Sequence, residues 1–300
     1  MTRTMTIFAA TALLLAACRT GDPVPGTDPM PSSPTTTTPA TTDAAAPTGA
    51  YVDVGGYELF IACRGSGSPT VVFEAGLGGD NSSFFTVDAE VSTTTTTCGY
   101  DRAGIGSSDE RPASDSPATA GEAADELDRL LAGAGIEGSI VLVGHSFGGM
   151  VEQLYADRHP ERVAGLVFVD TAMAGQLTPA DRNWEEAPGV LIDMRRTKRE
   201  LEGVGSYGAT PMVVLTQAFV GEADVPASFQ RLWPRLHDQL AANSNDSVHL
   251  IAVGSGHFIQ EDEPDLVIAA IEEVLASVRD GQPLAPCDGR FADAGGKCAV

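Results

Sequence analysis

Ser146 stands in the stretch Gly144-His145-Ser146-Phe147-Gly148, which matches the pattern G-x-S-x-G. Ile140–Val143 before it is a short apolar run typical of a strand buried on both faces, and Met150–Arg158 after it has apolar residues at roughly helical spacing. A tight turn between strand and helix strains the serine, and flanking side chains would collide with the neighbouring backbone. The sequence therefore predicts a nucleophile elbow, with the Ser146 hydroxyl exposed at a helix N-terminus.

The histidines are the candidate bases, because an uncharged serine hydroxyl is a poor nucleophile without one. His145 adjoins the nucleophile, but its side chain would leave the strand in the opposite direction, so we expect it to pack beneath or support the site. Because it is so close to the nucleophile, we also count His145 among the expected substrate-binding residues. The other four are His159 at a helix end, His237 within a helical pattern and expected to be exposed or half-buried, His249 at the start of a strand, and His257 in a Gly-Ser-Gly-His loop after a strand.

Strand and helix patterns alternate along residues 51–280. Gly55 and Gly56 are a hairpin signal between the first two strands, and Thr119 with Glu122 forms a capping box at a helix start. The predicted strands are Tyr51–Val54, Tyr57–Ala62, Thr70–Ala75, Thr93–Thr97, Ile140–Val143, Val163–Val169, Met212–Thr216 and, as the last, His249–Val253. The predicted helices are Asn81–Val91, Thr119–Ala134, Met150–Arg158, Ser228–Leu240 and Pro264–Val278. This alternation predicts an α/β fold with a mostly parallel central sheet flanked by helices.

Residues 171–210 interrupt the alternation between two predicted strands. Thr178 and Pro179 are typical of a helix start, and a few apolar residues such as Trp184 are scattered among charges. An insertion here would lie over the carboxyl ends of the strands. Two interpretations stay open: a small cap over the site, or a purely structural crossover.

The chain has 300 residues with 43% hydrophobic content, enough for one domain with a sizeable core and appendages. Its 18 basic and 41 acidic residues give a formal net charge of −23. This charge argues against nucleic acid as a partner and against electrostatic docking on anionic lipid.

The N-terminus is typical of a targeting segment. Arg3 supplies a positive charge, and Ile7–Ala17 is an apolar region too short to span a bilayer. The sequence Leu15-Ala16-Ala17-Cys18 resembles the lipobox of bacterial lipoproteins, which implies cleavage of residues 1–17 and lipid on Cys18. Residues 18–50, rich in Thr, Pro and Ala, predict a disordered tether. We therefore expect a protein anchored to a bacterial membrane in the cell envelope, on its extracytoplasmic side.

The remaining cysteines are Cys63, Cys98, Cys287 and Cys298, and four cysteines allow three disulfide pairings. Cys287 and Cys298 are close enough in sequence to close a loop within the tail, residues 281–300, which leaves Cys63 for Cys98. A metal site is the competing interpretation, but the sequence has no CxxC and no nearby histidine cluster, so we expect no metal.

Four motifs in order carry a resemblance to a known family: Phe73–Gly79, Tyr100–Gly106, Gly144–Gly149 and Gly254–Gln260. Together they resemble the α/β-hydrolase superfamily, in its esterase- and lipase-like branch, over roughly residues 51–278. The resemblance implies that the strands before Gly65 and Gly99 are neighbours, which agrees with a Cys63–Cys98 bridge.

The resemblance also implies roles for single residues. His257 matches the family's catalytic histidine, as general base for Ser146 and general acid to the leaving group. The acid follows one of two strands, and we favour Asp170 over Asp224, because the loop around Asp224 departs from the family pattern. The oxyanion hole is expected from the N–H groups of Leu77 and Phe147, with Gly76 and Gly78 letting the backbone approach substrate closely. The segment Tyr100-Asp101-Arg102 is expected to be a structural turn.

The implied activity is hydrolysis of small carboxylic esters through an acyl-serine intermediate, with no metal or organic cofactor. A serine at the elbow argues against the dehalogenase and epoxide-hydrolase branches, which resemble this fold but use aspartate there. An amidase, peptidase or acyltransferase on the same residues stays open, as does a lipid-anchored binding protein without turnover. The sequence leaves the oligomeric state open.

Overall fold

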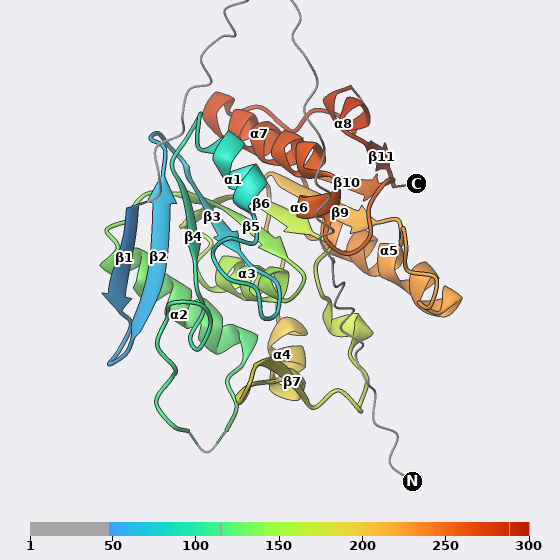
Figure 1. Cartoon of the computed structure of the whole chain (residues 1–300). Helices are drawn as coiled ribbons and strands as arrows, with labels where there is room; N and C mark the ends of the chain where they lie inside the picture. The colour runs from blue at the N-terminus through green and yellow to red at the C-terminus, as the bar shows by residue number, and fades with distance from the viewer. Residues whose placement is uncertain (1–47, 115, 288, 300) are drawn as a thin grey trace, which may run out of the picture. The chain divides into compact units, whose positions relative to one another are not determined.

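A computed structural model of the chain describes residues 48–114, 116–287 and 289–299. A nine-stranded sheet forms its centre, with the strand order β1-β2-β4-β3-β5-β6-β9-β10-β11 (Figure 1). Neighbours from β4 to β10 are parallel, and both edges are antiparallel. The strands are β1 Thr48–Asp53, β2 Glu58–Arg64, β3 Thr70–Glu74, β4 Thr97–Tyr100, β5 Ile140–His145, β6 Val163–Val169, β9 Met212–Gln217, β10 Ser247–Ala252 and β11 Gly296–Cys298.

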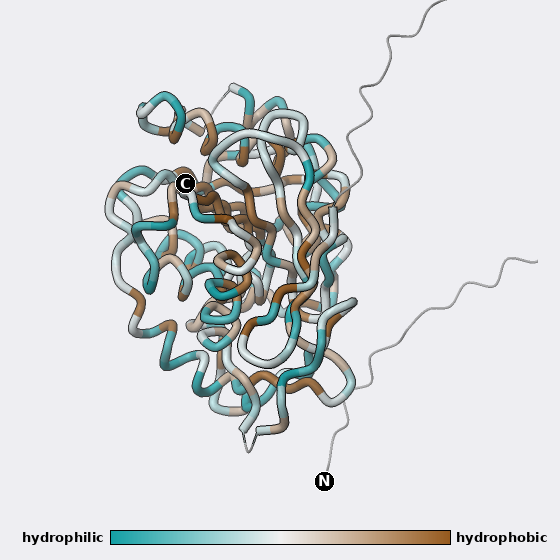
Figure 2. Tube along the Cα trace, turned by 90° about the vertical axis from the view of Figure 1, so that its left-hand side faces the viewer, coloured by the Kyte–Doolittle hydropathy of each residue, from teal (hydrophilic) through white to brown (hydrophobic). Residues whose placement is uncertain are grey.

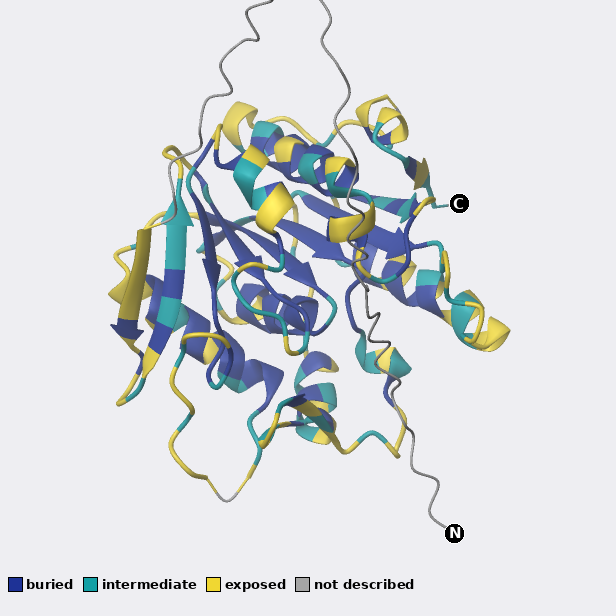
Figure 3. Cartoon of the chain, viewed as in Figure 1, coloured by how far each residue is buried: buried dark blue, intermediate teal, exposed yellow. Residues whose placement is uncertain are grey.

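Helices cover both faces of this sheet (Figure 1). The helices are α1 Phe85–Val91, α2 Ala120–Gly133, α3 Phe147–Arg158, α4 Met194–Leu201, α5 Ala227–Ala241, α6 Ile259–Asp262, α7 Pro264–Asp280 and α8 Arg290–Asp293. Side chains of β5 alternate between two apolar clusters: Leu142 packs with α2 and α3, whereas Val141 and Val143 pack with α1 and α7. The most hydrophobic stretches gather inside the molecule (Figure 2), and the central strands are buried (Figure 3).

This architecture confirms the predicted fold class, an α/β protein with a mostly parallel sheet between helices. The capping box is also confirmed: the Thr119 side chain accepts from the Glu122 backbone N–H, and the Glu122 side chain accepts from the Thr119 N–H. The first strand begins at Thr48, so the predicted tether boundary at residue 50 is three residues too far. The predicted signal peptide, Cys18 and the tether up to residue 47 lie outside the described residues.

The threonine run does not form the predicted strand Thr93–Thr97, because β4 begins only at Thr97. The Thr93 and Thr94 hydroxyls instead donate to the carbonyls of Glu90 and Val91 at the end of α1, at 2.7 and 3.1 Å. Local hydrogen bonds of this kind compete with a strand, and here they outweigh the β propensity of threonine.

The insertion between β6 and β9 contains a two-stranded hairpin, β7 Asn183–Ala187 and β8 Val190–Asp193, followed by α4. A short 3₁₀ turn, Ala174–Gln176, precedes the hairpin. The predicted helix start at Thr178 is wrong: the Asp181 carboxylate accepts from both the backbone N–H and the hydroxyl of Thr178, which closes a turn.

Two disulfides have the pairing that we favoured, Cys63–Cys98 and Cys287–Cys298. Cys63 and Cys98 are direct cross-strand partners on β2 and β4.

The prediction that β10 is the last strand is wrong, because β11 in the tail pairs antiparallel with β10. Among the described residues, no helix has the length and apolar character needed to cross a membrane.

Candidate active site

The chain turns sharply at Ser146, between β5 and α3, with backbone angles φ 50° and ψ −117°. A Cβ atom on Gly148 would lie 2.3 Å from the carbonyl oxygen of Glu74, and one on Gly144 would lie 2.9 Å from the nitrogen of Gly149. Neither site has room for a side chain, which is the physical reason for both glycines. The predicted strained turn between strand and helix is therefore confirmed.

Three predicted side chains meet above this turn: Ser146, His257 and Asp170. The Ser146 Oγ lies 3.0 Å from His257 Nε2, and His257 Nδ1 lies 2.6 Å from Asp170 Oδ2. An ionised carboxylate only accepts hydrogen bonds, so His257 carries its proton on Nδ1 and leaves Nε2 free to accept from the serine hydroxyl. This chain of carboxylate, imidazole and hydroxyl can activate the hydroxyl as a nucleophile.

The Asp170 carboxylate is fully buried at the end of β6. Its Oδ1 accepts from the backbone N–H of Gln217 at 2.9 Å and from the indole N–H of Trp233 at 2.7 Å. These donors turn Oδ2 toward His257. The alternative acid, Asp224, is instead exposed in the segment before α5.

The structure also brings residues to His257 that the sequence analysis missed. Glu222 accepts a hydrogen bond from the His257 backbone N–H at 2.9 Å, and Trp233 supports Asp170 as described above. The sequence did place Trp233 in a helix, but nothing in the local pattern marks its contact with a strand end.

His237 was expected to be exposed or half-buried, yet it is fully buried and bonds to the hydroxyl of Thr216 at 2.5 Å.

His145 lies beneath the site, only 3% exposed. Its Nε2 bonds to the carbonyl oxygen of His257 at 2.9 Å, and the two rings are 4.7 Å apart. Burial, and then the nearby His257, lower the pKa of His145 to about 3, so the ring is neutral and its Nε2 donates. His145 therefore supports the His257 loop, and its burial leaves it little surface for the substrate contact we expected.

The loop after β3 approaches the serine closely. A Cβ atom on Gly76 would lie 3.5 Å from Ser146 Cβ and 2.6 Å from the His145 ring. Gly78, with φ +76°, faces the inserted hairpin, since its Cβ would lie 2.9 Å from the carbonyl oxygen of Glu186. Leu77 lies between these glycines, and Phe147 directly follows Ser146 at the start of α3. Both expected oxyanion donors thus belong to segments that adjoin the serine.

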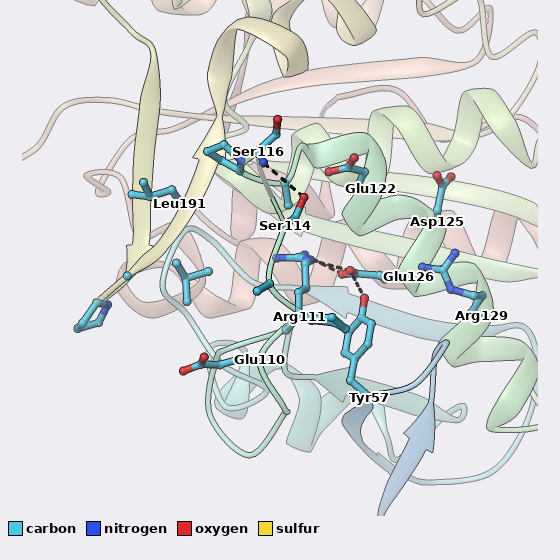
Figure 4. A pocket seen from close by; sticks show the side chains of 18 residues that line it. Tyr57, Glu110, Arg111, Ser114, Ser116, Glu122, Asp125, Glu126, Arg129 and Leu191 are labelled. Carbon is cyan, nitrogen blue, oxygen red and sulfur yellow. Dashed lines mark hydrogen bonds and ion pairs between the residues drawn. The ribbon is translucent and has the colours of Figure 1, made fainter.

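A cavity of about 780 Å³ lies elsewhere, between α2, residues 110–114 and 116–118, and the turn of the hairpin (Figure 4). Its lining does not include Ser146, His257 or Asp170. Arg111 on its wall donates twice to Glu126, at 2.6 and 2.7 Å.

Within the described ranges, no group of histidine, cysteine and acidic side chains could hold a metal ion.

Glu152 on α3 is a fully buried carboxyl group beneath the elbow, without a hydrogen-bond partner of good geometry among the described residues. Burial, and then the charge of Glu74, raise the pKa of Glu152 well above its usual value. The native protein therefore holds a proton that the unfolded chain releases above about pH 4.3, and the free energy of unfolding falls with rising pH by up to about 1.4 kcal/mol per pH unit.

Glu152→Gln removes this titration, so the melting temperature of the variant should rise relative to wild type as the pH increases from about 5 to about 8. Melting followed by circular dichroism at both pH values checks this. The matched control is Glu137→Gln, because Glu137 is exposed. If the melting temperatures of Glu152→Gln and wild type differ by the same amount at both pH values, the assignment of a buried proton to Glu152 is contradicted.

Comparison with known proteins agrees with this fold. A family model described as the alpha/beta hydrolase fold matches residues 69–195. The uncharacterized protein YqjL of Bacillus subtilis is 28% identical over 232 residues, which cover 74% of this chain and 89% of that protein. Methylesterase 9 of Arabidopsis thaliana is 34% identical over 98 residues, 33% of this chain and 37% of that protein.

A thermophilic esterase from Thermogutta terrifontis has a similar structure, with a TM-score of 0.57 and 21% identity over 77% of this chain and 99% of that chain. The chain therefore has the α/β-hydrolase fold. Since this fold serves many reactions, the reaction has to be argued from the site.

Proposed function

We propose that this protein is a serine hydrolase that cleaves carboxylic esters through an acyl-Ser146 intermediate. The observation that carries the proposal is the chain of two hydrogen bonds, 3.0 Å from Ser146 to His257 and 2.6 Å from His257 to Asp170. The strained turn supports it further, since strain at a nucleophile is typical of catalytic elbows.

In the proposed acylation, the Ser146 oxygen attacks the ester carbonyl carbon while His257 Nε2 takes the hydroxyl proton. The N–H groups of Leu77 and Phe147 stabilise the oxyanion. His257 then gives the proton to the leaving alcohol as the ester C–O bond breaks. Water, activated by the same imidazole, attacks the acyl-enzyme and releases the acid. Asp170 holds the imidazole and stabilises its cation throughout.

An ester with an apolar group suits the surroundings of His257. Phe258 is 51% exposed and its ring lies 5.4 Å from the His257 ring, while Val220 is 50% exposed in the loop that contacts Gly256. Two of the similar proteins are named a methylesterase and an esterase, and these names support the proposal that the substrate is an ester. We propose that the inserted hairpin and α4 form a small cap beside the loop after β3, because a Cβ atom on Gly78 in that loop would lie 2.9 Å from the carbonyl oxygen of Glu186.

The test uses a serine-reactive fluorophosphonate and a set of nitrophenyl esters, matching anilides and acceptor alcohols. We expect labelling and ester hydrolysis in the wild type, and neither in His257→Ala. Faster turnover of anilides would favour an amidase, and transfer to the added alcohol an acyltransferase. A folded wild type that neither labels nor hydrolyses any ester would favour the non-catalytic binding protein.

We also propose that the protein is anchored to a membrane of the cell envelope through lipid on Cys18. The sequence before Cys18 supports this proposal, because the apolar segment Ile7–Ala17 ends in a lipobox-like sequence. Separation of membrane and soluble fractions for wild type and Cys18→Ala tests it, and an unchanged distribution would refute the anchor.

A further inference from the structure

A single arginine, Arg102, contacts both segments that carry the expected oxyanion donors. We propose that Arg102, held by Glu74 and by Glu186 of the inserted hairpin, is a positioning residue that orients the N–H groups of Leu77 and Phe147. The inference rests on the proposed function, because it concerns how the same site stabilises an oxyanion. It also gives the insertion a role in building the site.

The contact with the loop after β3 fixes the orientation of a peptide plane. Arg102 Nη1 donates to the carbonyl of Ala75 and Nη2 to the carbonyl of Gly76, each at 2.6 Å. The Gly76 carbonyl and the Leu77 N–H belong to one planar trans peptide and point in opposite directions. By holding the carbonyl on its own side, Arg102 turns the Leu77 N–H away from itself.

The second contact is with the residue after the nucleophile. The guanidinium carbon lies 5.2 Å from the centre of the Phe147 ring, within the range of a cation–π interaction. Phe147 is fully buried and begins α3, so its ring and its N–H are fixed together. One cation thus touches the two segments on which the oxyanion hole depends.

Two carboxylates hold the guanidinium in this orientation. Glu74 Oε1 accepts from Nη1 at 2.6 Å, and Glu186 Oε1 accepts from Nε at 2.6 Å and forms an ion pair with Nη2 at 2.5 Å. With the two backbone carbonyls, four of the five N–H groups of Arg102 have hydrogen-bond acceptors. A lysine has only three N–H donors around one nitrogen and cannot reproduce this set.

Stability alone does not explain this arrangement. The Arg102 side chain is 2% exposed and both carboxylates are 0% exposed. Burying charges is costly, and a buried ion pair often stabilises no better than apolar residues of similar volume. Arg102 and its two carboxylates do provide a fixed geometry that links β3, the segment after β4 and the hairpin strand β7, next to Ser146.

The test measures kcat and KM for a nitrophenyl ester, together with the NMR amide shifts of Leu77 and Phe147, in Arg102→Lys and Glu186→Gln. We expect kcat to fall about 100-fold in Arg102→Lys and about tenfold in Glu186→Gln, with KM changed less than about threefold. The Leu77 amide resonance should shift in both variants. Glu186→Gln keeps Glu74 as a partner for Arg102, so it carries the test if Arg102→Lys does not fold.

The matched control is Arg111→Lys, because Arg111 also makes a two-pronged pair with a carboxylate, Glu126, but lies on the wall of the separate cavity (Figure 4). Its kcat should stay within about twofold of wild type. Unchanged kcat in both test variants, or an unmoved Leu77 resonance, would overturn the positioning role. If the wild type itself does not hydrolyse esters, the proposed function fails, and the NMR shifts alone decide the inference.

Discussion

Replacement of Ser146 by alanine should lower kcat for ester hydrolysis by about 10⁵- to 10⁶-fold, to the residual rate of a site that binds substrate but has no nucleophile. The reason is that Ser146 Oγ lies 3.0 Å from His257 Nε2, where it can pass its proton to the imidazole and attack the ester. Alanine at this position has no hydroxyl to act as the nucleophile. Steady-state kinetics with a nitrophenyl ester checks this, and covalent labelling by the fluorophosphonate should disappear in parallel.

The strained backbone at residue 146 makes the control important, since alanine has no hydroxyl but keeps a Cβ at φ 50°. Circular dichroism and an unchanged melting transition should show that Ser146→Ala is folded. Ester hydrolysis that continues at the wild-type rate in a folded Ser146→Ala protein would refute the acyl-serine mechanism.

Replacement of Asp170 by asparagine should lower kcat about 10⁴-fold. Asp170 Oδ1 accepts from Gln217 and Trp233, so the amide oxygen of asparagine would take that position and the amide NH₂ would face His257 Nδ1. Nδ1 would then accept, and the imidazole proton would move to Nε2. A protonated Nε2 cannot accept from the Ser146 hydroxyl, so the base is lost while the packing is kept.

Asp224→Asn is the matched control, because it makes the same chemical change at an exposed carboxylate. Its kcat should stay within about twofold of wild type, as expected for a surface substitution. The same kinetic assay decides between the two aspartates. A large loss in Asp224→Asn together with full activity in Asp170→Asn would mean that the segment before α5 rearranges when substrate binds.

Local patterns predicted most of the fold. The strand β6 has the bounds that the apolar run Val163–Val169 predicts, and α2 has the capping box predicted at Thr119. These features depend on side chains within a few residues of one another, so the sequence displays them directly. The threonine run is an exception: its hydrogen bonds to the end of α1 are equally local, but the β propensity of threonine indicated a strand instead.

The features of this protein fall into two groups, those that depend on local sequence and those that depend on tertiary packing. By itself the sequence determined the alternating α/β architecture and the strained turn at Ser146, because short-range sterics and periodicity dictate both. Only the tertiary structure decided that Asp170 rather than Asp224 meets His257, and that Arg102 joins the loop after β3 to the hairpin. Those contacts join residues 87 and 84 positions apart, and the buried donors and carboxylates that hold them come together only when the sheet and the insertion have packed.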